Sequence, residues 1–125
     1  MKTPENLYYT NEHEWVKVND DIATVGVTDF AQSSLGDVVY VEVEVLDEEL
    51  EADGVFGTIE AVKTVSDLFQ PVTGVIFEIN EALEDDPELV NNDPYGDGWI
   101  VKIKMSDMSE INNLMSPEEY KNLTE

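Results

Sequence analysis

One lysine stands between two segments of strand-favouring residues in the stretch GTIEAVKTVSDLFQPVTG, residues 57–74. This residue, Lys63, is one of six lysines in a chain that has 29 acidic residues and no arginine. A lysine amine is a nucleophile on a flexible stem, and acylation removes its charge. Its neighbours Val62 and Thr64 are β-branched and disfavour strained turn conformations. The pattern predicts a rigid turn that presents Lys63 for acylation, with an ordinary solvated lysine as the alternative.

Few other side chains could carry chemistry. The chain has no cysteine, which excludes disulfides, thiol catalysis and cysteine-ligated metal sites. His13 is the single histidine, so multi-histidine metal sites are excluded and a serine triad has one available base. No serine lies in a nucleophile-elbow motif. We therefore predict a protein that binds or carries, with neither a metal site nor enzymatic activity of its own.

The net charge of -23 limits the class of partner. Such a surface repels phosphate backbones and anionic membranes, so we expect neither nucleic-acid nor membrane binding. Basic partners are favoured, and their encounter with the chain should weaken as salt increases. No apolar run reaches the length of a membrane span, and the first residues match no signal or transit peptide. We expect a cytoplasmic protein, or a mitochondrial matrix protein if this is a processed eukaryotic form.

The elements that must position Lys63 are mostly short strands. We predict strands at residues 13–18, 22–27, 38–45, 55–62, 74–80 and 99–105. A short helix is predicted between a cap at Thr28 or Asp29 and Gly36. In the strand at 38–45 the alternation predicts a buried face formed by Val39, Val41, Val43 and Val45.

The C-terminal part of the chain is predicted to be helical from Ser106 onward. Residues 116–119 read as a capping box, and Tyr120 and Leu123 continue an apolar face. Pro71 should end the strand that follows Lys63 or place it at a sheet edge. The acidic connection 81–98 is expected to hold one helical turn near Pro87, and Trp15 and Trp99 are predicted to lie in the core.

A weak internal repeat organises the middle of the chain. Residues 36–61 and residues 74–103 each read as strand, acidic loop, strand, and Lys63 falls between the two units. Two similar halves joined at a tip predict a flattened barrel or sandwich of short strands with a terminal helix packed on it.

Four segments along the chain share a further property. They are, in order, YTNEHEWV, VGVTDFAQSSLGDVVYVEV, GTIEAVKTVSDLFQPVTG and INEALEDDPELVNNDPYGDGWIVKIKMSD. Together they resemble the glycine cleavage system H-protein family. The resemblance implies a mainly β, lipoyl/biotinyl-type flattened β-barrel sandwich of two similar halves with short helices. It implies one lipoyl-carrier domain over residues 1–125, with a core hairpin at about 36–104 and a C-terminal helical segment at about 106–125.

The function implied by the resemblance is that of a swinging-arm carrier in glycine catabolism and one-carbon metabolism. Lys63 would hold lipoic acid in amide linkage. The arm would take the aminomethyl group of glycine from a pyridoxal-phosphate glycine decarboxylase to a tetrahydrofolate-dependent aminomethyltransferase. It would then carry reducing equivalents to a dihydrolipoamide dehydrogenase. A lipoate ligase or lipoyl transferase would attach the cofactor, and we expect the chain to be a monomer.

The same resemblance assigns roles to residues near Lys63. Glu60 and Gly74 match positions that would be important for recognition by the lipoylating enzyme, with an ordinary acid on a strand face as the alternative for Glu60. Glu14 and Asp67 are assigned to seating the amine-bearing arm. His13 matches a position near the attachment loop and is either a further arm-seating residue or a structural histidine.

Alternative carriers remain to be separated from this interpretation. Lipoyl domains of 2-oxoacid dehydrogenases typically have Asp before the lysine, and biotin carriers flank it with methionines, whereas this chain has Val62 and Thr64. An H-protein-like chain that relays or stores lipoyl groups for other enzymes would have the same attachment motif. The acidic loop 46–54 departs from the family, which often has Pro and Gly there.

Overall fold

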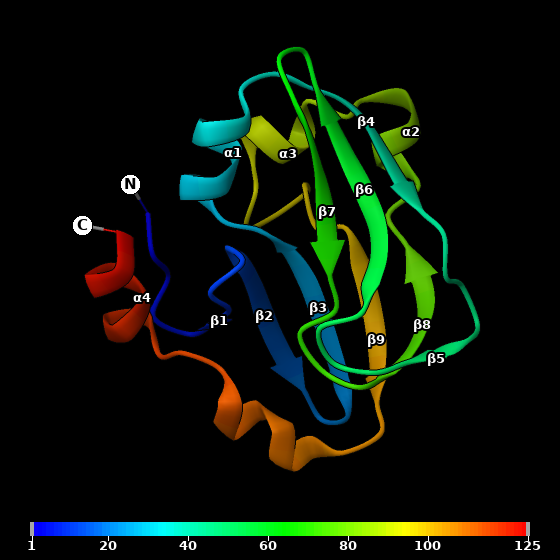
Figure 1. The fold of residues 1–125 in the computed structure, drawn as a ribbon, viewed down its shortest axis with the longest axis vertical. Coiled ribbons are helices and arrows are strands. Elements are labelled where there is room, and N and C mark those ends of the chain that lie inside the picture. Colours follow the sequence, from blue (N-terminus) through cyan, green and yellow to red (C-terminus); the bar gives the residue numbers. More distant parts are fainter. Residues whose placement is uncertain (1, 125) are drawn as a thin grey trace.

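The computed structural model describes residues 2–124, in which two β-sheets pack face to face and short helices cover their ends (Figure 1). The larger sheet has the strand order β1-β2-β3-β9-β8-β5, and the smaller has the order β4-β6-β7. The strands are β1 (Tyr8–Tyr9), β2 (Glu14–Asn19), β3 (Ile22–Val27), β4 (Val38–Val43), β5 (Glu49–Leu50), β6 (Val55–Ala61), β7 (Val65–Phe69), β8 (Gly74–Ile79) and β9 (Val101–Met105). The helices are α1 (Asp29–Leu35), α2 (Ala82–Asp85), α3 (Leu89–Asn92), the 3-10 helix η1 (Met108–Asn113) and α4 (Pro117–Thr124).

The predicted mainly β sandwich of two similar halves is confirmed. The first strand–loop–strand unit supplies the antiparallel pair β4–β6, and the second supplies the antiparallel pair β8–β9. The two pairs lie in opposite sheets, which form a sandwich and do not close into a barrel within residues 2–124. None of the helices in that range is long and apolar enough to cross a membrane.

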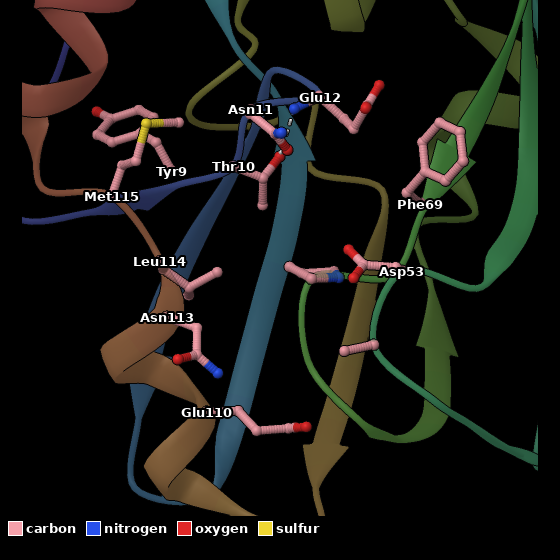
Figure 2. Close-up of a pocket in the computed structure, with 12 residues that line it drawn as sticks. Tyr9, Thr10, Asn11, Glu12, Asp53, Phe69, Glu110, Asn113, Leu114 and Met115 are labelled. Carbon is pink, nitrogen blue, oxygen red and sulfur yellow. Dashed lines mark hydrogen bonds between the residues drawn. The ribbon is translucent and has the colours of Figure 1, made fainter.

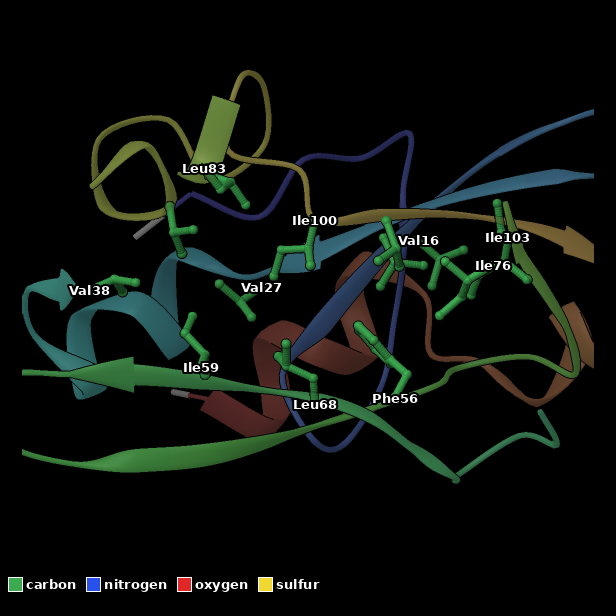
Figure 3. Packing of buried hydrophobic residues seen from close by; sticks show 14 of the residues in the cluster. Val16, Val27, Val38, Phe56, Ile59, Leu68, Ile76, Leu83, Ile100 and Ile103 are labelled. Carbon is green, nitrogen blue, oxygen red and sulfur yellow. The ribbon is translucent and has the colours of Figure 1, made fainter. Parts of the chain in front are cut away.

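The core lies between the two sheets (Figure 3). The hairpin β6–β7 contributes Phe56, Ile59 and Leu68, which are at most 2% exposed, and the larger sheet contributes Ile76 and Ile103 opposite them. An isolated two-stranded hairpin is marginal in water, so this burial is what fixes the hairpin. Truncating one of these side chains to alanine costs about 2–5 kcal/mol. The turn that carries Lys63 is therefore attached to a firmly packed base.

The predicted burial of Val39, in the strand observed as β4, is wrong. The register of β4 against β6 shifts between Val38 and Tyr40, which marks a β-bulge. A bulge adds one residue to one strand and reverses the face of the residues that precede it. Val38 is consequently buried and Val39 is 52% exposed.

Several other local predictions can be compared with the structure. The capping box is confirmed, because the Ser116 backbone N–H donates to Glu119 Oε1 at 3.0 Å and the Glu119 N–H donates to Ser116 Oγ at 3.2 Å. Leu123 is 52% exposed, so it does not extend the buried face of α4. Two short helices, α2 and α3, lie on either side of Pro87 where one turn was predicted. Strand β5 lies inside the segment predicted to be an acidic loop.

Candidate functional site

Lys63 lies in the turn between β6 and β7, at the tip of the hairpin (Figure 1). Inside the hairpin, the Ala61 N–H donates to the Thr64 carbonyl at 2.8 Å. Outside it, the Val62 N–H donates to the Asp37 carbonyl at 3.0 Å and ties the turn to the loop after α1. The turn is thus bonded on two sides. This arrangement agrees with the predicted rigid turn, and Lys63 itself is exposed.

The stem of Lys63 lies against Gly36. This glycine ends α1 with a φ of 81°, a backbone conformation that side chains rarely adopt. A Cβ placed on Gly36 would lie 3.2 Å from Lys63 Cε, so the missing side chain leaves the space that the stem occupies. Within residues 2–124 no hydrogen bond or ion pair engages the Lys63 amine. The sequence predicted Gly36 only as the end of the helix.

Asn91, in α3, fixes the loop to which the turn is bonded. Its side-chain oxygen accepts from the Val38 N–H at 2.8 Å, and its side-chain nitrogen donates to the Gly36 carbonyl at 2.8 Å. The loop after α1 is therefore held from both of its ends. Sequence reasoning did not single out this residue, and its only signal was its place within the fourth segment of family resemblance.

Glu60 and Gly74, the two residues assigned to recognition by the lipoylating enzyme, lie near opposite ends of the β6–β7 hairpin. Glu60 is half-buried in β6, in register with Tyr40 on one side and Val65 on the other, close to the tip. Gly74 begins β8, beyond the opposite end of β7 (Figure 1). A Cβ on Gly74 would collide with the Lys104 carbonyl oxygen, so close backbone packing requires a glycine there. The structure places Glu60 near Lys63 and Gly74 at the base of the hairpin.

A pocket of about 150 Å³ brings His13, Glu14 and Asp67 together. We call it the hairpin pocket. It lies between the start of β2, helix α1 and the strands β6 and β7, and its apolar lining includes Phe30 and Leu68. The remaining lining residues are Glu12, Val27, Ala31, Ser34, Leu35, Ile59 and Ser66. The three residues that the resemblance assigned to one environment thus come together from the start of β2, where His13 directly precedes Glu14, and from β7, which holds Asp67.

Glu14 is a buried carboxyl in the wall of this pocket. It is 2% exposed, and its two oxygens accept from Thr10 Oγ1 at 2.9 Å and from the Phe69 N–H at 3.0 Å. Burial raises the pKa of the Glu14 carboxyl to about 8, although both hydrogen bonds act in the opposite direction. At neutral pH the side chain is therefore mostly protonated, and Glu14 supplies less negative charge to the pocket than its residue type suggests.

His13 has both a structural contact and a place in the pocket. Its φ is 67°, its Nδ1 lies 2.9 Å from Tyr120 Oη, and its ring lies 4.7 Å from that of Phe30. Burial lowers the pKa of the His13 imidazole, so the ring is neutral at neutral pH. Tyr120 was predicted only as part of an apolar helix face. The position of its hydroxyl against His13, 107 residues away in sequence, could not be read from local pattern.

A second pocket, of about 610 Å³, lies at the other end of the hairpin (Figure 2). Its lining residues are Tyr9, Thr10, Asn11, Glu12, Ala52, Asp53, Phe69, Pro71, Glu110, Asn113, Leu114 and Met115. The Glu110 carboxylate is already engaged, since it accepts from the Thr73 N–H at 2.7 Å and from Thr73 Oγ1 at 2.9 Å. Thr10 and Phe69, the partners of Glu14, line this pocket, so Glu14 lies between the two cavities. Sequence reasoning missed it because its residues come from separate segments that share no motif.

Trp15 has the core position predicted for it, whereas Trp99 lies at the margin of the core. Trp15 is 1% exposed and packs with Leu7, Tyr9 and Tyr120, and Trp99 is partly buried against the same cluster. The indole N–H of Trp15 donates to the Pro94 carbonyl at 2.8 Å. Neither residue lines the hairpin pocket.

Comparisons of sequence and of structure with known proteins agree on one family. A sequence model described as "Glycine cleavage H-protein" matches residues 7–125. The glycine cleavage system H protein of Bacteroides thetaiotaomicron is 58% identical over 121 residues, covering 97% of this chain and 96% of the relative. That of Salinibacter ruber is 53% identical over 124 residues, covering 99% of this chain and all of the relative. A crystal structure of the glycine cleavage system H protein from Mycobacterium marinum superposes with a TM-score of 0.87 at 36% identity, covering 95% and 96% of the two chains.

These relatives carry the glycine cleavage name over nearly their full lengths, which favours that role over a lipoyl relay. The chain belongs to the glycine cleavage H-protein family, whose members are non-catalytic lipoyl carriers of the glycine cleavage system.

Proposed function

We propose that Lys63 is the residue that holds the lipoyl group, in amide linkage to Nζ, and that its stem is the base of the swinging arm. The observation that carries this proposal is an exposed, unengaged amine on a turn that is hydrogen-bonded on two sides. Gly36 supports it, because the glycine leaves room for the stem. A lipoyl group supplies a redox-active disulfide, which a chain without cysteine lacks.

We propose that the hairpin pocket seats the arm when it bears an amine. Apolar side chains such as Phe30 and Leu68 suit the hydrocarbon part of an arm, and Asp67 offers an exposed carboxylate for a cation. Glu14 would act first as a neutral hydrogen-bonding group. A cation placed beside it favours its ionised form, so we expect the loaded arm to lower the pKa of Glu14 and to release a proton.

The partners proposed for this carrier are glycine decarboxylase, aminomethyltransferase, dihydrolipoamide dehydrogenase and a lipoate ligase or lipoyl transferase. Glu60 supports recognition by the lipoylating enzyme, since it lies beside the tip. For Gly74 we propose an indirect part, in which its close packing against β9 sets the base of the hairpin. A cytoplasmic location and a monomeric state remain predictions from the sequence.

The experiment that tests the proposal is intact-protein mass spectrometry with peptide mapping after incubation with lipoate, ATP and an active lipoate ligase. We expect one added lipoyl group, on the peptide that contains Lys63. Lys63→Arg should fold and gain no lipoyl group, because a guanidinium does not replace the amine as the acylated nucleophile. Lys17→Arg is the matched control. Lys17 is also exposed but lies in strand β2, so this variant should be modified at Lys63 like the wild type. Modification of Lys63→Arg, or none of the wild type, would refute the assignment.

A further inference from the structure

The C-terminal helix reaches the wall of the hairpin pocket through one hydroxyl group. Tyr120, in α4, is 1% exposed and its ring stacks on that of Tyr9, with the ring centres 4.7 Å apart and the planes at 10°. Its Oη lies 2.7 Å from Thr28 Oγ1 and 2.9 Å from His13 Nδ1. The hydroxyl does not line the pocket itself. It contacts residues that hold two of the pocket's walls in place.

Thr28 connects this hydroxyl to helix α1. It is fully buried, and its Oγ1 accepts from the Ala31 N–H at 3.1 Å as the cap of the helix. Its backbone N–H donates to the His13 carbonyl at 3.1 Å. Ala31 and His13 both line the hairpin pocket. One group of hydrogen bonds therefore joins α4, the start of α1 and the loop before β2.

Counting protons in this group selects one arrangement. Each hydroxyl has one proton to donate, and buried donors in folded proteins are nearly always paired. If His13 Nδ1 carried the proton and donated to Tyr120, then Tyr120 would donate to Thr28, and the Thr28 proton would have no acceptor among residues 2–124. In the opposite direction each hydroxyl proton has an acceptor: Ala31 N–H donates to Thr28, Thr28 to Tyr120, and Tyr120 to His13 Nδ1. The donor then left without a partner among residues 2–124 is His13 Nε2–H, on a partly exposed ring, in place of the fully buried Thr28 hydroxyl.

We propose that Tyr120 is a positioning residue for the arm pocket, and that its hydroxyl fixes His13 as the tautomer with the proton on Nε2. The other ring nitrogen, Nε2, is then a donor. An amine-bearing arm would find its hydrogen-bond acceptors in carboxyl groups such as Asp67. His13 contributes an imidazole ring of fixed orientation to the lining of the pocket. Burial keeps Tyr120 protonated and His13 neutral, which both agree with this arrangement. The pocket's role rests on the proposed function, whereas the tautomer does not.

The test is 15N NMR of the unmodified chain labelled on histidine, where His13 gives the only histidine signals. At neutral pH we expect the wild type to show Nδ1 unprotonated and Nε2 protonated. Tyr120→Phe removes the hydroxyl and keeps the ring that stacks on Tyr9, so the population with the proton on Nδ1 should rise. Tyr9→Phe is the matched control, because it removes a hydroxyl from the same stack, one that donates to the Pro4 carbonyl at 2.6 Å, and it should keep the wild-type tautomer.

The second readout is the rate at which the lipoylated, amine-loaded chain loses its load in the absence of partner enzymes. Tyr120→Phe should raise this rate roughly two- to tenfold, the range expected for one hydrogen bond, while Tyr9→Phe should leave it unchanged. A wild-type histidine protonated on Nδ1 would overturn the proposal without any variant. An unchanged rate of load loss in Tyr120→Phe would overturn the positioning role. If Lys63 accepts no lipoyl group, the mass measurement reveals it and the pocket's role falls, whatever the tautomer.

Discussion

The buried carboxyl of Glu14 makes the stability of this protein depend on pH in an unusual direction. Burial raises the pKa of Glu14 from 4.5 to about 8, so the folded state binds a proton more tightly than the unfolded state does. The stabilising contribution of that proton is complete below pH 4.5 and is lost as the pH rises through about 8. With about 1.4 kcal/mol for each pH unit between the two values, the loss is at most about 5 kcal/mol.

The perturbation is Glu14→Gln, which keeps the size of the side chain and one acceptor oxygen but cannot ionise. At pH 5 we expect the two proteins to differ by no more than about 1 kcal/mol, because both folded side chains are neutral and the pH lies only half a unit above the unfolded-state pKa of 4.5. At pH 9 the variant should be the more stable protein by several kcal/mol. This difference follows from the cost of a buried, ionised carboxylate, whose hydrogen bonds from Thr10 and Phe69 offset only part of its desolvation.

The assay is urea denaturation of both proteins at several pH values from 5 to 9, with the free energy of unfolding as the readout. The many other carboxylates affect both proteins alike, so the difference between the two curves isolates Glu14. Parallel curves would refute the reasoning. A Glu14 pKa near 4.5, measured by 13C NMR on the folded wild type, would refute it independently.

Two further predictions concern the frame around the site. Gly74→Ala should lower the free energy of unfolding by about 1–3 kcal/mol, because the new Cβ collides with the Lys104 carbonyl; urea denaturation measures this. Full lipoylation of the folded fraction of that variant would limit Gly74 to a packing role, whereas poor lipoylation would support a part in recognition. Ser116→Ala should cost about 1 kcal/mol by removing the cap of α4, and a change below the precision of the denaturation curves would contradict the capping argument.

The parts of the fold that sequence predicted well are those fixed by local chemistry. The strand at 22–27 is long enough to show a strand pattern in its own residues, the Thr28 cap and the capping box of α4 depend on neighbours a few residues away, and all three are present. Strands β1 and β5 have two residues each, too few for a period to be visible, and they exist because β2 and β8 supply their partners. The exposure of Val39 depends on a bulge against β6, which nothing in the alternation of β4 reveals.

The candidate site likewise has one part that local sequence predicts and one part that depends on the fold. Lys63 and its neighbours form one continuous segment, so residue type and resemblance were enough to single them out. The hairpin pocket joins residues from β2, α1 and β7, and the sequence could group His13, Glu14 and Asp67 only through resemblance. The protonation of Glu14 and the contact of Tyr120 with His13 depend on burial and on distances across the whole chain. The sequence therefore predicted a charged Glu14, whereas the structure favours a neutral carboxyl at this residue.

The arrangement around Lys63 also indicates why a hydrogen-bonded turn carries a lysine whose amine is not engaged by any of residues 2–124. An enzyme that acylates the amine must order whatever is flexible at the site, and each ordered side chain costs roughly 0.5–1.5 kcal/mol. Two backbone hydrogen bonds hold the turn, and Ile59 and Leu68 bury its base, so the backbone is ordered before any partner arrives. Gly36 supplies open space for the Lys63 stem and no polar side chain that would hold the amine. Under the proposed function, the part of the site that no hydrogen bond restrains is the arm itself, and a flexible turn would add an ordering cost at every encounter.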